Sequence, residues 1–329
     1  MRPQRKPQAR QENTADIPFY RKLIGKGAQP AALKTAVVMP VDERSLKGAV
    51  EAVHKDMIMP VLIGPEDEIR KTAEEHSLDI GQLEIEDCAN EQEASQRAVE
   101  LAAQGRVEAI MKGHLPTHIL LKAVVQESQL RTGRNMSHVF ALAGKDYPKP
   151  LFISDAALNI DPTLEEKRNI TQNAIDLFRC LGFGTPKVAL LSATEHVTSD
   201  IPDTIEAAAI CKMADRGAIT GGIVEGPLAF DNAISKKAAE AKGIKSKVAG
   251  EADILIVPDL QSGNMLYKQM RYLAGYEAAG IVMGARIPVI LTSRAATTPT
   301  RLASCALALM VAEQGAQERR EPVEIEKRL

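Results

Sequence analysis

The sequence has few cysteines and almost no net charge, and each shortage excludes a class of protein. Cys88, Cys180, Cys211 and Cys305 are far apart, so they provide neither a disulfide framework nor a CxxC metal-binding pair. We therefore expect free thiols in a reducing compartment, which favours a cytoplasmic protein. The 41 Lys and Arg residues nearly balance the 43 Asp and Glu residues, and the net charge of -2 predicts no binding to nucleic acid or to an anionic membrane.

The sequence also lacks an apolar run of the roughly twenty residues that a membrane-spanning helix needs. Residues 1–31 are rich in Gln, Arg and Pro, and they contain neither the apolar core of a secretory signal nor a helical or strand periodicity. We interpret them as a flexible lead-in, either a solvated tail or the remnant of a linker to another module, in preference to a partner-binding arm. The charged stretch 317–329 is interpreted as a frayed tail.

Several catalytic motifs are absent. The sequence contains no GxGxxG at a strand–helix turn, no GxxxxGK[ST], no HExxH and no GxSxG. These absences argue against a standard Rossmann dehydrogenase, a P-loop enzyme, a zinc protease and an α/β-hydrolase. His114 and His118 could chelate zinc from one helical face, but no third ligand is near in the sequence. We therefore predict no catalytic metal and favour a structural or surface role for both histidines.

The sequence does contain one repeated pattern: a short apolar, β-branched run, a turn residue, and a longer stretch with helical spacing. Most of the runs are continuously apolar, which is typical of parallel strands covered by helices on both faces. The fold class is therefore predicted to be α/β. The expected strands are 35–41, 60–64, 108–113, 138–142, 151–155, 188–192, 222–226, 253–259, 280–284 and 288–293.

Helix starts and a central boundary can also be predicted. One helix is expected to begin after Asp42, and another after Asp161 and Pro162, with the second helix running to Leu181. Proline fits the first turn of a helix, and acidic residues are favourable at the positive end of the helix dipole. The polar, Pro-rich segment 144–150 is the best candidate for a boundary between two domains.

Polar residues gather directly after the expected strands, where open α/β sheets bind their ligands. We expect them to meet at one end of the sheet, although each alone could be only a cap or a turn residue. They are Lys112–His114, Ser154–Asp155, Ser192–His196, Glu225–Pro227, Asp259–Asn264 and Thr292–Arg294.

Two of these segments suggest specific contacts. Thr292, Ser293 and Arg294 precede a helix, so hydroxyls, a guanidinium and helix N–H groups could together cradle a phosphate. In the alternative reading, Ser293 only ends the strand and Arg294 pairs with a surface carboxylate. Gly263 permits close approach of the backbone to a ligand, and Asn264 is expected to bond either that ligand or the helix N-terminus.

The C-terminal half of the chain strongly resembles the phosphate acetyltransferase and phosphate butyryltransferase family. Upstream segments resemble the same family, so the likeness covers about residues 32–315. The matching segments are GIVEGPLAFDNAIS (222–235), KGIKSKVAGEADILIVPD (242–259), QSGNMLYKQMRYLAGYEAAGIVMGARIPVILTSRA (261–295), SCALALMVAEQ (304–314), AIMKGHLPTHILLKAVV (109–125) and LRTGRNMSHVFAL (130–142).

The resemblance implies a subunit of two α/β/α domains with largely parallel sheets, an active site in the cleft between them, and a homodimer. This is the architecture of isocitrate and isopropylmalate dehydrogenases. The first domain would comprise 32–149 together with 294–316, and the second 150–293. The implied reaction is acyl-CoA + phosphate = acyl phosphate + CoA, with direct transfer of a short acyl group in a ternary complex. Coenzyme A is then a substrate, and no cofactor is implied.

The resemblance also implies roles for individual residues. Arg294 would clamp the phosphate or the carbonyl, and Ser293 would donate near the reacting sulfur or carbonyl. Of the two nearby arginines, Arg134 is preferred to Arg131 as an anion-binding residue. The complete set expected to bind coenzyme A, phosphate or the acyl group is Lys112, Lys122, Arg134, Gly263, Asn264 and Thr292.

Two departures from the family pattern leave the general base unassigned. Acetyl-specific relatives carry an Asp where this chain has Thr300, which cannot serve as that base, and Gln261 replaces the family's usual Glu. The chain shares Lys112–Gly113, Arg131–Gly133 and Pro258–Asp259 with butyryl-type relatives. It therefore leans toward the butyryl-type branch, which also contains enzymes with acetyl activity.

Two other functions stay open at this point. A non-catalytic acyl-CoA-binding homologue would explain Gln261 and Thr300, but the retained Ser293 and Arg294 weigh against it. A dehydrogenase of related fold would use NAD(P) and a divalent metal, but the sequence has no cluster of Asp residues suited to Mg²⁺ or Mn²⁺.

Overall fold

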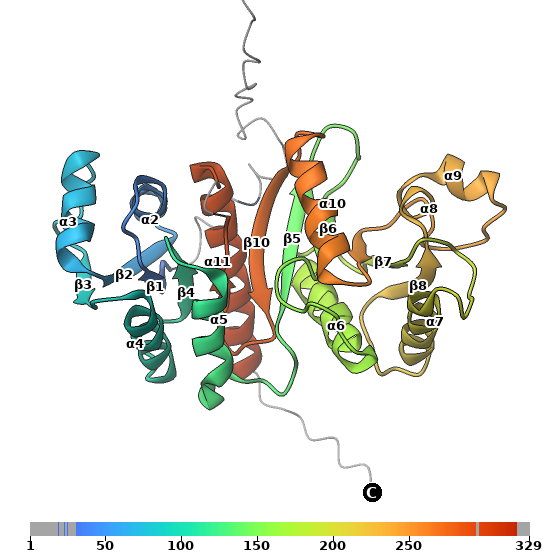
Figure 1. Ribbon diagram of the computed structural model, residues 1–329, viewed down its shortest axis with the longest axis horizontal. Coiled ribbons are helices and arrows are strands. Elements are labelled where there is room, and N and C mark those ends of the chain that lie inside the picture. Colours follow the sequence, from blue (N-terminus) through green and yellow to red (C-terminus); the bar gives the residue numbers. More distant parts are fainter. Residues whose placement is uncertain (1–18, 20–22, 24, 26–30, 294–295, 321–329) are drawn as a thin grey trace, which may run out of the picture.

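Figure 1 shows the computed structural model, which describes residues 31–293 and 296–320 together with Phe19, Leu23 and Gly25. The predicted lead-in 1–31 and tail 317–329 therefore lie mostly outside the described residues. Within the described part of the chain, no helix is long and apolar enough to cross a membrane.

Among the described residues, eleven strands form one sheet, which confirms the predicted α/β fold class. Their order across the sheet is β3-β2-β1-β4-β11-β10-β5-β6-β9-β7-β8. Every strand expected from the sequence is present. The additional strand β3 (Glu84–Asp87) lies at the sheet edge and has the sequence EIED, which contains no apolar run to predict it. The others are β1 (Leu33–Val38), β2 (Ile58–Gly64), β4 (Ala109–Lys112), β5 (Ser137–Ala143), β6 (Leu151–Ser154), β7 (Lys187–Leu191), β8 (Ile223–Leu228), β9 (Ile254–Ile256), β10 (Glu277–Met283) and β11 (Val289–Ile290).

The sheet consists of two parallel halves that run in opposite directions. β1, β2, β3, β4 and β11 are parallel to their neighbours on one side, and β6, β9, β7 and β8 are parallel on the other. Between them, β10 is antiparallel to both β11 and β5, and β5 is antiparallel to β6. The prediction of largely parallel strands is thus confirmed, with an antiparallel centre.

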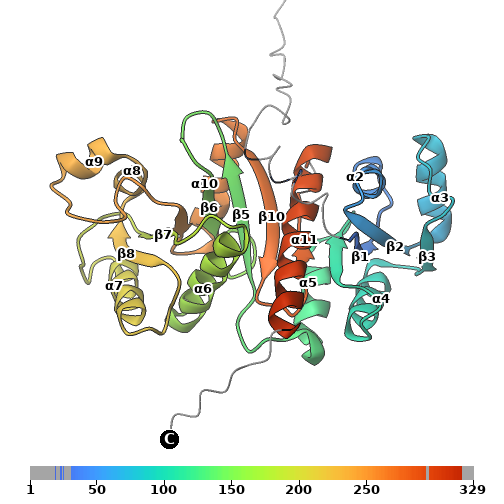
Figure 2. The same cartoon turned by 180° about the vertical axis from the view of Figure 1, so that it is seen from behind.

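Helices cover both faces of the sheet (Figures 1 and 2). Two of them begin close to where the sequence predicts: Asp42 caps α2 by accepting from the backbone N–H of Ser45 at 3.0 Å, and Thr163 and Glu166 form a reciprocal capping box at the start of α6. Pro162, expected in the first turn of α6, instead precedes its N-cap Thr163. The helices of eight residues or more are α2 (Glu43–His54), α3 (Glu66–Glu75), α4 (Glu91–Ala103), α5 (Thr117–Gln126), α6 (Leu164–Cys180), α7 (Pro202–Asp215), α10 (Leu260–Tyr272) and α11 (Thr298–Arg320).

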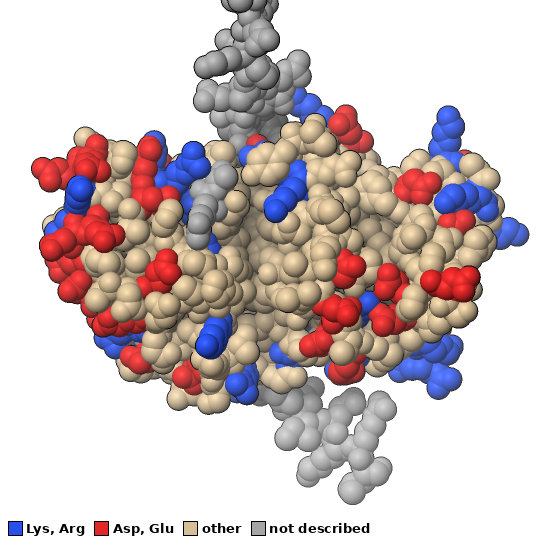
Figure 3. Space-filling model, viewed as in Figure 1, with Lys and Arg blue, Asp and Glu red and all other residues tan. Residues whose placement is uncertain are grey.

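The hydrophobic core is continuous on one face of the sheet and divided on the other. On the continuous face, α2, α3, α6, α7 and α11 share a single cluster of buried side chains. On the opposite face, α4 and α5 pack over the first half of the sheet, while α10 and the short helix α8 (Phe230–Ile234) pack over the second, and the short helix α9 (Lys236–Ala241) packs against α8. The surface is hollowed between these two groups of helices (Figure 3).

The predicted domain boundary at 144–150 falls in the loop that joins β5 to β6. These two strands are hydrogen-bonded neighbours, so the sheet runs uninterrupted past this loop. β10 and β11, which the predicted second domain includes, lie between β4 and β5 in the sheet. The division into 32–149 plus 294–316 and 150–293 stays a prediction.

Candidate functional site

The polar strand ends are not all at one edge of the sheet, as the sequence led us to expect. Because β6 and β9 run opposite to β4 and β11, Ser154–Asp155 and Asp259 follow strands that end at one edge, whereas Lys112 and Ser293 follow strands that end at the other. The expectation was wrong because two direct antiparallel connections, β5 to β6 and β10 to β11, reverse the chain where no helix intervenes.

Thr292 and Ser293 form the turn after β11. Thr292 is buried and its hydroxyl accepts from Nη1 of Arg301 at 2.9 Å, while Ser293 is exposed and its carbonyl lies 3.5 Å from Nη2 of the same arginine. Thr300 is buried, and its hydroxyl lies 3.1 Å from that of Thr297 within the first turn of α11. The predicted catalytic residue Arg294 lies outside the described residues.

Lys112 ends β4 at the same edge of the sheet. Its side chain is 3% exposed, and its Nζ lies 3.3 Å from the carbonyl oxygen of Gly113. Beyond it, Nδ1 of His114 lies 3.4 Å from Oδ2 of Asp42. Burial raises the pKa of Asp42, but hydrogen bonds from Ser45 and the neighbouring His114 outweigh burial and bring that pKa below its ordinary value. Sequence reasoning did not identify Asp42 as part of this edge.

Gly263 and Asn264 hold α10 against the loop that follows β6. A Cβ on Gly263 would come within 2.6 Å of the carbonyl oxygen of Asp155, so glycine is required there by the protein's own backbone. The Asn264 amide donates to the carbonyl of Ala156 at 3.1 Å, and Asp259 caps α10 by accepting from the N–H of Ser262 at 2.7 Å. The Asn264 amide thus bonds the loop after β6 rather than the N-terminus of α10.

Asp155 organises the loop under α10. Its carboxylate accepts from the backbone N–H groups of residues 157, 158 and 159 at 2.9, 3.1 and 3.2 Å, and from the side chain of Asn159. Burial raises the pKa of Asp155, and these hydrogen bonds act in the opposite direction. The Asn159 amide also donates to the carbonyl of Met136 at 2.9 Å, which ties the loop to the start of β5.

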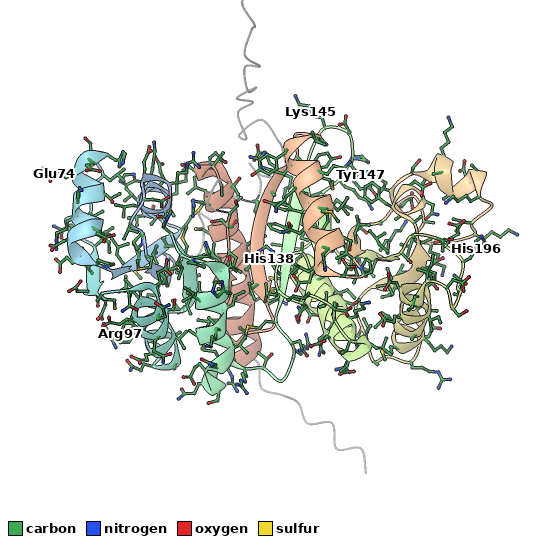
Figure 4. All side chains as sticks on the ribbon, in the orientation of Figure 1. Glu74, Arg97, His138, Lys145, Tyr147 and His196 are labelled. Atoms are coloured by element: carbon green, nitrogen blue, oxygen red, sulfur yellow. The ribbon has the colours of Figure 1, made fainter. Side chains whose placement is uncertain are left out.

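A row of rings crosses the antiparallel centre of the sheet. Tyr267 of α10 stacks on Phe140 with ring centroids 3.7 Å apart, and Phe140 contacts the ring of His138 at 4.2 Å. His138, labelled near the centre of the molecule in Figure 4, is 1% exposed, and burial lowers its pKa to about 4. Sequence reasoning missed this residue, although it stands alone among apolar residues in the strand SHVFALA.

A cavity of about 920 Å³ brings together two of the predicted binding residues, Lys122 of α5 and Arg134. Arg131 lines it as well, and no Asp or Glu is among the described residues that line it. Nη1 of Arg134 lies 2.5 Å from Oδ2 of Asp176, whereas Nε of Arg131 donates to the carbonyl of Val125 at 3.0 Å. The cavity is therefore basic and suited to an anionic ligand.

A second cavity, of about 740 Å³, is lined by the turn between β10 and β11 and by parts of α6 and α11. Its arginines, which include Arg179 and Arg286, are accompanied by the carboxylates of Glu108 and Asp176. Its charges nearly balance, so the larger, basic cavity is the better candidate for an anion.

Comparison with known proteins identifies the family. The family model described as "Phosphate acetyl/butaryl transferase" matches residues 89–309. A protein named phosphate acetyltransferase from Rhizobium meliloti is 53% identical over 294 residues, which cover 89% of this chain and 93% of that protein. The chain belongs to the phosphate acetyl/butyryl transferase family.

Other members of this transferase family support the assignment. A phosphate butyryltransferase from Clostridium acetobutylicum is 37% identical over 297 residues, covering 90% of this chain and 99% of that protein. The crystal structure of a branched-chain phosphotransacylase from Enterococcus faecalis has a TM-score of 0.73 at 28% identity and covers 85% of this chain and 99% of that one. The resemblance predicted from the sequence is confirmed.

The same fold is also found in a protein outside this transferase family. A 4-hydroxythreonine-4-phosphate dehydrogenase from Klebsiella pneumoniae has a TM-score of 0.53 at 13% identity, covering 85% of this chain and 100% of that one. This likeness supports the dehydrogenase-like architecture expected for the transferase. No group of three or more metal-ligating side chains occurs among the described residues. The assignments of Ser293, Arg294 and the six binding residues stay predictions.

Proposed function

We propose that this protein is a phosphate acyltransferase that exchanges a short acyl group between coenzyme A and inorganic phosphate. The observation that carries the proposal is the match over nearly the whole chain to proteins named for this activity, at up to 55% identity. In the balanced reaction, acyl-CoA + phosphate = acyl phosphate + CoA, the carbonyl carbon loses its bond to sulfur and gains a bond to a phosphate oxygen.

Acetyl is the acyl group to test first. The relatives named phosphate acetyltransferase from Rhizobium and Rickettsia share 53–55% identity with the chain, and those named phosphate butyryltransferase share 36–37%. The motifs that the chain shares with the butyryl-type branch do not argue against testing acetyl first, because that branch also contains enzymes with acetyl activity. One methylene changes specificity by only about 1–3 kcal/mol, so butyryl-CoA belongs in the same assay.

The basic cavity fits the anionic part of coenzyme A. Lys122, Arg131 and Arg134 bring three cations to a space of about 920 Å³, and of these Arg134 is also ion-paired with Asp176. Phosphate groups bind well to arginine forks and lysine ammonium groups in such surroundings. We therefore infer that Lys122 and Arg134 bind the phosphates of coenzyme A. The pantetheine arm would extend from there into the hollow between the two groups of helices, toward the turn after β11 (Figure 3).

The turn after β11 is the proposed place of transfer. Ser293 is exposed there, and its hydroxyl would donate to the acyl carbonyl as negative charge develops on that oxygen. Arg294 would hold the phosphate. A thiol with a pKa near 8.5 is mostly protonated at neutral pH, so a positive environment favours the thiolate. Thr300 is packed inside the first turn of α11, which agrees with its having no role as base.

The remaining expectations belong to the same proposal. Coenzyme A enters as a substrate, and no cofactor or metal takes part in the balanced reaction. We also propose that the enzyme works in the cytoplasm as a homodimer, and light scattering coupled to size-exclusion chromatography measures that oligomeric state.

Release of free thiol from acetyl-CoA and butyryl-CoA, measured with and without phosphate, tests the function. We expect release that requires phosphate, and we expect it to be abolished in Arg294→Ala. Formation of acetyl phosphate, trapped with hydroxylamine, provides an independent readout of the same reaction. Tight coenzyme A binding without phosphate-dependent release would contradict the proposal and favour a binding protein.

A further inference from the structure

A buried arginine lies directly beneath the turn that carries Ser293. Arg301 is 1% exposed although it carries a permanent charge, and it is the largest of the fully buried side chains of the described residues. It is the fourth residue of α11, on a helix whose following residues 302–309 are all buried. Its position at the start of an apolar helix therefore forces the guanidinium inside the protein, against the end of β11.

The contacts of Arg301 are directed at this turn. Nη1 donates to the hydroxyl of Thr292 at 2.9 Å, and Nη2 lies 3.5 Å from the carbonyl oxygen of Ser293. Its Nε is buried without a hydrogen-bond partner. Across the described residues, no carboxylate lies within 4.0 Å of its guanidinium, so its charge is not neutralised by direct contact.

A glycine of helix α2 leaves space for the Arg301 side chain. Gly48 of α2 faces Arg301, and a Cβ at that position would come within 2.5 Å of the arginine Cδ. Glycine in the middle of a helix is less favourable for folding than alanine. Both the glycine and the buried, unpaired charge are unfavourable for folding, and a buried charge without an ion-pair partner is unfavourable by more.

We infer that Arg301 is a positioning residue for acyl transfer: it fixes the Thr292–Ser293 turn and places a buried positive charge, which no described carboxylate contacts directly, beneath it. The inference rests on the proposed function, because the turn is the proposed place of transfer. Burial lowers the pKa of Arg301, but an arginine so placed keeps its charge. The charge then favours the anionic acyl phosphate and the thiolate near the turn.

The test compares Arg301→Met, Arg301→Lys and Gly48→Ala with the wild-type enzyme. For each protein, kcat and KM for acetyl-CoA and phosphate, the Kd of coenzyme A and the thermal unfolding midpoint are measured. We expect Arg301→Met to lower kcat by about tenfold to a hundredfold, the usual effect of misaligning a reacting group, while the Kd of coenzyme A stays the same. Its unfolding midpoint should be unchanged or higher, because methionine buries no charge.

The other two variants separate position from charge. Arg301→Lys keeps the charge but not the two-pronged donor, so we expect a kcat between those of wild type and Arg301→Met. Gly48→Ala keeps the arginine but displaces it, so kcat should fall. Gly315→Ala is the matched control, since this α11 glycine has no atom within 4 Å of an added Cβ and its kcat should equal that of wild type.

Four results would overturn the inference. One is an Arg301→Met enzyme with a lowered unfolding midpoint but full kcat per folded molecule, because the arginine would then serve only the fold. If Arg301→Met does not fold, full kcat in both Arg301→Lys and Gly48→Ala has the same meaning. A wild-type enzyme without phosphate-dependent release would overturn the proposed function and this inference together, whereas an active wild type with unaffected variants would overturn only the inference.

Discussion

Nε2 of His138 lies 3.3 Å from the carbonyl oxygen of Leu291, although β10 separates their strands in the sheet. The ring reaches across because β10 has Gly280 at this point, where a Cβ would come within 2.7 Å of the imidazole. In the neutral ring, Nε2–H donates to the carbonyl, and Nδ1 is left buried without a partner. A histidine of β5 thus holds the strand that ends at the proposed site of transfer.

The pKa of His138 predicts a loss of stability in mild acid. Its folded pKa of about 4 is below its ordinary value of 6.5, so only the unfolded state takes up a proton between these values. The free energy of unfolding should be unaffected above pH 6.5 and should fall by about 3 kcal/mol on going down to pH 4. Urea unfolding of wild type and His138→Phe across this range measures the difference, and parallel pH profiles for the two proteins would contradict the prediction.

Reversing the charge of Lys122 should weaken the binding of coenzyme A. Lys122→Glu places a carboxylate in a cavity lined by Arg131 and Arg134, so the phosphates of coenzyme A lose one cation and meet one anion. We expect the KM for acetyl-CoA to rise roughly tenfold or more, with kcat unchanged, and the effect to shrink at high salt. Lys237→Glu, on the exposed surface of α9, is the control and should leave both constants unchanged. Equal KM values for acetyl-CoA in the two variants would mean that coenzyme A does not bind in this cavity.

Gly263→Ala should destabilise the protein through the packing of α10. The added methyl meets the carbonyl of Asp155 and Cγ2 of Val257, at 2.6 and 2.8 Å, and neither can move freely in a buried site. We expect a loss of about 1–3 kcal/mol in the free energy of unfolding, measured with urea. Gly315 lies on a helix with open space around an added Cβ, so Gly315→Ala should instead raise the free energy of unfolding by up to about 1 kcal/mol. An unchanged free energy of unfolding in Gly263→Ala would contradict the prediction and mean that the loop after β6 can move to accommodate the methyl group.

Three of the four cysteines should be unreactive in the folded enzyme. Burial raises the pKa of Cys211 and Cys305 to about 12, and it also raises that of Cys88. Because the thiolate is the reactive form, we expect a thiol reagent at pH 8 to modify these residues slowly until the protein is unfolded in guanidinium chloride. Rapid release of colour from more than one thiol of the native protein would contradict this. The same measurement gives the amount of thiol that the protein itself contributes to the coenzyme A release assay.

Local signals in the sequence are sufficient to place most strands and helices. Runs such as 138–142 and 188–192 are strands because continuous apolar residues are buried between two layers of helices, and Asp42 begins a helix because its carboxylate caps it. These signals are local, so they can be recognised without the fold. The family was also predictable, since its motifs extend through most of the chain and 221 of its residues, 89–309, match the family model.

Which strand ends lie together and which charges are buried depend on contacts between segments that are far apart in the sequence. The direction of β6 relative to β4 depends on antiparallel pairing at the sheet centre, and no periodicity within either strand records it. Gly263 packs against the backbone of Asp155, a contact that the sequence does not indicate because the partner of a glycine comes from a distant segment. The role inferred for Arg301 also depends on distant segments. Its own helix α11 buries it, Gly48 of α2 leaves space for its side chain, and Thr292 and Ser293 after β11 accept its hydrogen bonds.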